Sequence, residues 1–132
     1  MQKTTTVLLV TDRPQQSFDV VKILYDKLVQ VMTENQEFKL LLASYEEMKE
    51  RFISADIVLL GYPNQALIAR LSYLYGKTSY VDLIDLSAYS VIDAQRLKRQ
   101  ILTIDKLTKE AFNDHHQLKW NILCTFKKKS RK

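Results

Sequence analysis

Short, predominantly apolar runs alternate along this chain with longer segments in which apolar residues recur at spacings of three and four. The short runs lie at residues 7–10, 38–43, 55–61 and 80–84, of which only the first is free of charged residues, and the periodic segments lie at 18–32, 44–53, 63–76 and around 97–104. A continuous apolar run is typical of a strand buried on both faces of a parallel sheet, whereas the periodic spacing is typical of an amphipathic helix. This alternation predicts an α/β domain with an open parallel sheet flanked by helices.

Local signals at the ends of the segments agree with this division. Ser44 is followed three residues later by Glu47, which is the pattern of a helix capping box. Gly76 is well placed to end the third helix. Residues 85–90 are expected to form a loop that leads into the last helix.

The 132 residues are enough for one domain with a single core, because a chain of this size buries about two thirds of its unfolded surface. We assign residues 1–105 to this domain and residues 106–132 to a helical or extended C-terminal extension. Within the extension, residues 119–126 form either an added edge strand or a packed helix end.

The hydrophobic pattern also bears on the compartment. No apolar run approaches the roughly 18–20 residues of a membrane span, and the run at 7–10 is too short for a signal-peptide core. The single cysteine, Cys124, excludes an internal disulfide and suits a reducing compartment. We therefore expect a cytoplasmic protein without a membrane span.

The net charge of +5 is concentrated at the C-terminal end. Residues 1–103 hold 12 Lys/Arg and 12 Asp/Glu, whereas residues 104–132 hold 8 Lys/Arg and 3 Asp/Glu. The chain ends in a basic tail at residues 127–132. This tail is either a solvated terminus or an electrostatic contact for nucleic acid or another acidic partner, so nucleic-acid binding is expected only through it.

Candidate chemistry is expected at the carboxyl ends of the strands, where open α/β sheets bind ligands. The first loop occupies the place where such folds hold a phosphate, but it lacks glycine, and its proline and aspartate work against a set of amide donors. At most a weak anion site is predicted there. The loop consists of Thr11, Asp12, Arg13, Pro14, Gln15, Gln16 and Ser17, and the rim of the site of Tyr62, Asn64 and Tyr89.

The sequence also disfavours a catalytic nucleophile, a receiver domain, a flavin site and a metal site. Thr11 lacks an evident activating base, so it more simply caps a turn than acts as a nucleophile. The third strand ends without a phosphorylatable aspartate, which excludes a receiver domain, and the first loop lacks the Ser/Thr/Gly-rich composition of a flavin mononucleotide site. His115 and His116 are adjacent, so their side chains diverge and suit a shared metal poorly. No metal and no cofactor are predicted.

Two segments resemble a known family. Residues 55–61, ADIVLLG, resemble the "ADVVLLGPQ" strand of the lactose/cellobiose-class IIB proteins of the bacterial phosphotransferase system. Residues 81–93, VDLIDLSAYSVID, resemble that family's "VxVIDxxxYGxxDG" segment, and the last helix and first strand fall in register. The similarity covers about residues 5–103 and implies a three-layer αβα fold whose four parallel strands have the order 2-1-3-4.

The resemblance also implies an activity that this chain has lost. In the family, a cysteine at the end of the first strand accepts a phosphoryl group from IIA and relays it to a sugar. Thr11 stands at the matching position, and only Ser17 keeps the hydroxyl character of the family's loop. A thiolate is nucleophilic near neutral pH, whereas a threonine hydroxyl is not. We therefore expect that this chain does not catalyse phosphotransfer.

Three hypotheses follow. The first is a non-catalytic regulatory or protein-interaction domain, similar to the IIB-like C-terminal domains of Mga-type transcription regulators. Its expected partner is a phosphotransferase-system component, a regulator domain or a second copy of the chain. The second is a IIB phosphocarrier with an unusual acceptor, and the third is a basic nucleic-acid-binding module that acts through residues 127–132.

Overall fold

Four parallel strands form one sheet in the computed structural model, which describes residues 4–11, 19–61, 64–75 and 79–114. Their order across the sheet is β2-β1-β3-β4, and every neighbouring pair is parallel. The strands are β1 (Thr5–Thr11), β2 (Phe38–Ser44), β3 (Ile57–Leu60) and β4 (Tyr80–Leu83). The predicted α/β class and the order 2-1-3-4 are confirmed.

The two central strands supply the core of the sheet. The apolar residues from Val7 to Val10 in β1 and from Val58 to Leu60 in β3 are all 0% exposed. In the register of the sheet, Leu9 lies between Leu42 of β2 and Leu59 of β3. Full burial of such side chains contributes about 1.5–3 kcal/mol each, so these two short runs are a main source of stability.

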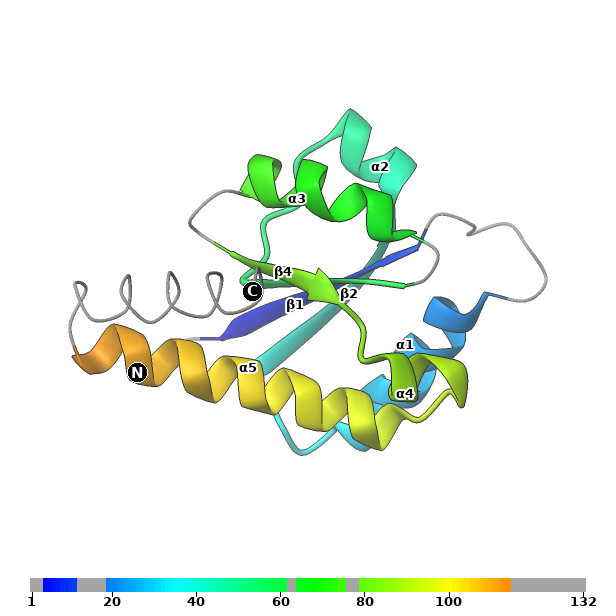
Figure 1. The fold of residues 1–132 in the computed structure, drawn as a ribbon. Helices are drawn as coiled ribbons and strands as arrows, with labels where there is room; N and C mark the ends of the chain where they lie inside the picture. The colour runs from blue at the N-terminus through cyan, green and yellow to red at the C-terminus, as the bar shows by residue number, and fades with distance from the viewer. Residues whose placement is uncertain (1–3, 12–18, 62–63, 76–78, 115–132) are drawn as a thin grey trace, which may run out of the picture. The chain divides into compact units, whose positions relative to one another are not determined.

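Helices cover both faces of the sheet. Figure 1 shows α2 and α3 on one face and α1 and α4 on the other. Leu24 and Leu28 of α1 are fully buried, as are Leu71 of α3 and Ala88 of α4, to within 1%. The helices are α1 (Val20–Val31), α2 (Tyr45–Glu50), α3 (Ile68–Tyr75), which follows the 3-10 turn η1 (Asn64–Leu67), α4 (Leu86–Ser90) and α5 (Ala94–Asp114).

One expected loop is a helix. Residues 86–90 form α4, and the Asp85 carboxylate accepts a hydrogen bond from the Ser87 amide at 3.4 Å to begin it. The side of α4 that carries Ala88 is buried. The prediction of a loop was wrong because a five-residue helix is too short to show a helical period, although its N-terminal cap is visible in the sequence.

The last helix is longer than the hydrophobic pattern indicates. The chain forms two compact units, Met1–Ile101 and Leu102–Lys132, and α5 begins in the first and continues to Asp114 in the second. Beyond residue 104, local interactions along the helix stabilise it. The Lys109 ammonium lies 3.0 Å from the Asp105 carboxylate, and the Thr108 hydroxyl donates to the Ile104 carbonyl at 2.9 Å. Within the described ranges, no helix is both long and apolar enough to cross a membrane.

Candidate functional site

The end of β1 and the start of α1 form the best-described part of the expected phosphate site. Thr11 is the last residue of β1 and is only 3% exposed. Tyr89 lies in α4 and is half-buried, and Asn64 begins η1. The loop 12–17 and Tyr62 fall outside the described residues, as do His115, His116, Cys124 and the basic tail.

Asp19 is the central acidic residue of this region. It is the N-terminal cap of α1, and its Oδ1 accepts hydrogen bonds from the amides of Val21 at 3.0 Å and Lys22 at 3.3 Å. Its other oxygen, Oδ2, accepts the hydroxyl hydrogen bond of Thr11 at 2.7 Å. One carboxylate therefore joins the end of the first strand to the start of the first helix.

This arrangement determines which charges the site accepts. The exposed amides at a helix N-terminus, together with the helix dipole, ordinarily attract an anion. Here the carboxylate of Asp19 already accepts from two of those amides and supplies the negative charge. At a separation of about 4 Å and an effective dielectric constant of about 20, two like unit charges repel by about 4 kcal/mol. A phosphate beside Asp19 would experience that repulsion.

Gly61 fixes how closely the neighbouring elements approach the site. It follows β3, and its amide donates to the Val10 carbonyl at 3.4 Å. A Cβ at this position would lie 2.2 Å from the Cγ2 of Val21 and 3.2 Å from a ring carbon of Tyr89. Since side-chain carbons do not approach to 2.2 Å, only glycine lets the first turn of α1 and the ring on α4 pack against the end of β3.

Sequence reasoning missed Asp19 and the contact of Gly61 with Val21. The periodic segment was expected to begin at residue 18, which hides the acid that caps the helix. The available signal was local, because an aspartate directly before an apolar periodic run is a common N-terminal cap. The contact of Gly61 had no comparable signal, since it joins elements that are 40 residues apart.

Metal chemistry finds no support in the described part of the chain. Among those residues, no group of three or more His, Cys, Asp or Glu side chains is placed to hold a metal ion. The site there consists of one carboxylate, one buried hydroxyl and the amides of a helix start.

No protein-family model matches this chain, and no curated protein matches it either.

Proposed function

We propose that this chain is a non-catalytic regulatory or protein-interaction domain built on a IIB-like scaffold of the phosphotransferase system, with a role in sugar-responsive regulation. The sheet order 2-1-3-4 agrees with the fold that the resemblance implies. Thr11 ends β1, where the resemblance expects the acceptor cysteine.

The hydrogen bond between Thr11 and Asp19 is the observation that carries this proposal. A phosphoryl acceptor needs a nucleophilic atom that an anionic donor can approach. Thr11 is buried, and its hydroxyl donates a hydrogen bond to the Asp19 carboxylate oxygen 2.7 Å away. A phosphoryl group on Thr11 would therefore lie beside the charge of Asp19, and its two negative charges would both be repelled. The local structure favours a stable strand–helix junction over group transfer.

The surface supports a role in binding proteins. Large apolar side chains are exposed on both helical layers, including Phe52 and Tyr73 on the side of α2 and α3 and Val91 after α4. Tyr73 is 91% exposed and Val91 is 68% exposed. Aromatic residues are enriched in protein interfaces, so the exposed Phe52 and Tyr73 support a binding role.

A phosphotransfer assay tests the proposal. The full chain is incubated with the phosphorylated general carrier protein and a lactose-class IIA, and a cysteine-containing IIB serves as the positive control. We expect label on the control and no stable label on this chain. The Thr11→Val variant, in which a methyl group replaces the hydroxyl, locates any label that appears. Label on the wild type that is absent from Thr11→Val would overturn the proposal in favour of a phosphocarrier.

A further inference from the structure

The turn between α4 and α5 holds an isoleucine where glycine is expected. The amide of Asp93 donates to the Ala88 carbonyl at 2.8 Å, and the amide of Ile92 donates to the Tyr89 carbonyl at 3.4 Å. This pair of bonds is the Schellman arrangement that ends many helices, and its left-handed residue is usually glycine. Here that residue is Ile92, with a φ of 53°. Among the described residues other than glycine, Ile92 alone has a positive φ.

An isoleucine in this conformation needs an explanation. The left-handed region brings Cβ close to the carbonyl oxygen, and a branched side chain makes the crowding worse. The side chain of Ile92 is half-buried, so packing against the fold offsets only part of this cost. Backbone conformations of this kind tend to occur where the surrounding structure serves a function. The contribution of Ile92 is therefore to be sought on the surface that its side chain helps to form.

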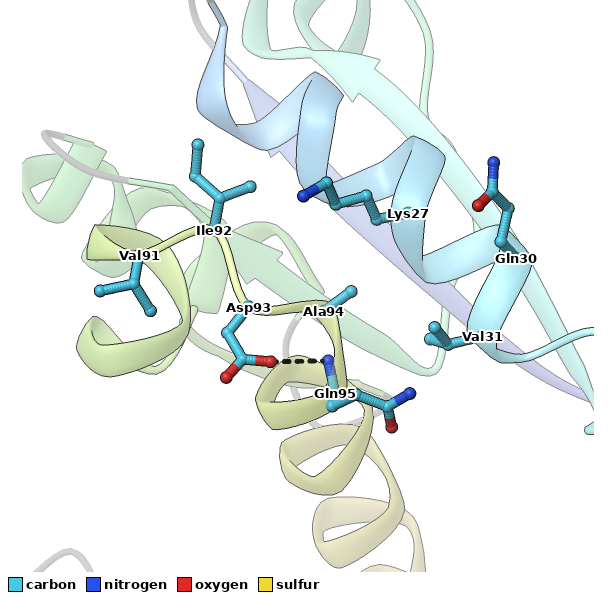
Figure 2. Close-up of a pocket in the computed structure, with 8 residues that line it drawn as sticks. All are labelled: Lys27, Gln30, Val31, Val91, Ile92, Asp93, Ala94 and Gln95. Carbon is cyan, nitrogen blue, oxygen red and sulfur yellow. Dashed lines mark hydrogen bonds between the residues drawn. The ribbon is translucent and has the colours of Figure 1, made fainter.

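That surface is an open hollow between α1 and the α4–α5 turn. It has a volume of about 440 Å³ and includes Lys27 and Val31 of α1 on one side and Val91, Ile92 and Ala94 on the other. Figure 2 shows the Lys27 side chain extending from α1 towards Ile92 across the hollow. Half of the lining residues are therefore apolar, and the other half are polar or charged, namely Lys27, Gln30, Asp93 and Gln95.

The charged side chains of the hollow differ in whether they already have partners. The Asp93 carboxylate accepts from the amides of Gln95 at 3.0 Å and Arg96 at 3.2 Å, and it pairs with the Arg96 guanidinium at 3.5 Å. The exposed Lys27 ammonium, by contrast, has no ion-pair partner among the described residues. The Lys98 ammonium adds positive charge nearby, since it donates to the Val31 carbonyl at 3.2 Å. The hollow therefore presents positive charge beside apolar side chains.

We propose that this hollow binds a short segment of a partner protein that carries an apolar side chain next to a carboxylate. The apolar side chain packs against Val91 and Ile92, and the carboxylate pairs with Lys27. The inference rests on the proposed function of an interaction domain and assigns that function a surface. An open hollow of this size holds one or two side chains, so the contact is weak unless neighbouring surface joins it.

Peptide selection on the full chain tests the assignment. A random dodecapeptide library displayed on phage is selected against the immobilised wild-type chain. We expect enriched peptides to combine Asp or Glu with Leu, Ile, Val or Phe. Their affinity should fall about tenfold in Lys27→Glu and severalfold in Val91→Ser, because these variants reverse the charge and shrink the apolar wall. Matched controls, Lys39→Glu on the exposed part of β2 and Val29→Ser on α1, should bind as the wild type does.

Ile92→Gly separates binding from folding. Glycine relieves the backbone at this turn, so the urea midpoint of the variant should equal or exceed that of the wild type. The selected peptides should nevertheless lose severalfold in affinity, because the apolar side chain of Ile92 is gone from the hollow. A large drop in the urea midpoint would show that the side chain of Ile92 serves the fold, and would overturn the inference.

The remaining outcomes also test the assignment of the hollow and the proposed function. No enriched peptide, or peptides that bind Lys27→Glu and Val91→Ser as tightly as the wild type, would overturn the assignment of the hollow. Neither result would place a phosphoryl group on Thr11, so the proposed function would then stand without this surface. Label on Thr11 in the phosphotransfer assay would overturn the proposed function while leaving a measured peptide site in place.

Discussion

Replacing Asp19 with alanine removes two kinds of stabilisation at once. The first is the cap of α1, where Oδ1 accepts from the Val21 and Lys22 amides, and loss of such a cap costs about 1 kcal/mol. The second is the hydrogen bond from the buried Thr11 hydroxyl to Oδ2, and a hydrogen bond to a charged group contributes about 1.5–3 kcal/mol. We therefore expect Asp19→Ala to lower the free energy of unfolding by about 3 kcal/mol.

A matched cap on another helix provides the control. Asp93 caps α5 in the same way, with its Oδ1 accepting from the Gln95 and Arg96 amides, but within the described residues its carboxylate accepts no hydrogen bond from a buried hydroxyl. Asp93→Ala should therefore cost only about 1 kcal/mol. The difference between the two alanine variants measures the contribution of Thr11.

Urea unfolding at neutral pH measures both effects, provided that the m-value stays constant across the variants. A double-mutant cycle with Thr11→Val then isolates the coupling between hydroxyl and carboxylate, which should be about 1–2 kcal/mol. Asn at position 19 keeps the cap and the contact, so Asp19→Asn should cost less than Asp19→Ala. A coupling energy within about 0.5 kcal/mol of zero would refute the account of this junction and weaken the proposed function with it.

Three further predictions concern packing, capping and pH. Gly61→Ala should lower the free energy of unfolding, measured in urea, by about 1–3 kcal/mol, because the added Cβ would lie 2.2 Å from the Val21 side chain. Adding Val21→Ala to the same chain should recover part of that loss. Equal stability of Gly61→Ala and wild type would contradict the contact. Ser44→Ala should cost about 1 kcal/mol by the same measurement, through loss of the bond from the Glu47 amide at 3.1 Å, and no change would show that the cap contributes nothing. Burial, and secondarily the neighbouring carboxylate of Asp82, raises the pKa of Tyr80 to about 12. Unfolded Tyr80 ionises near pH 10 while the folded group stays neutral, so its contribution is complete below about pH 10 and is lost as pH rises towards 12. Tyr80→Phe should therefore gain stability relative to wild type as pH rises from about 10 to about 12. A stability difference that stays constant over this range would contradict the raised pKa.

The strands could be predicted from the sequence because their signal is strong and local. The residues of β3 form an uninterrupted apolar run, and that run is fully buried as such a pattern predicts, to within 2% exposure. The capping box was equally visible. The Glu47 amide donates to the Ser44 hydroxyl at 3.1 Å, and the Ser44 amide donates to the Glu47 carboxylate at 3.2 Å.

The order of the strands had a different source. Alternation of strand and helix predicts a parallel sheet with right-handed crossovers, but several strand orders satisfy that rule. The order β2-β1-β3-β4 came from the resemblance, and the structure has that order. The positions of Asp19 and Gly61 depend on this order, because the ends of β1 and β3 are neighbours only when those strands pair.

The conformation of Ile92 could not be predicted from local propensity. Branched side chains favour extended backbone, and the left-handed end of a helix favours glycine or asparagine. The hydrogen bonds of the turn impose the opposite choice on this residue. Where a local rule fails in a structure that otherwise follows local rules, the failure is a reason to examine function.

Asp19 and Ile92 depart from expectation in opposite directions, and the contrast bears on what the domain does. Asp19 departs from the chemistry of a phosphate site but is locally favourable, because it caps α1 and accepts from Thr11. Ile92 is locally unfavourable by about 1–2 kcal/mol, and glycine would suit its turn better. The proposed loss of phosphate chemistry explains the first residue and leaves the second unexplained. The proposed binding role of the hollow gives a reason for a branched apolar side chain at a position whose backbone favours glycine.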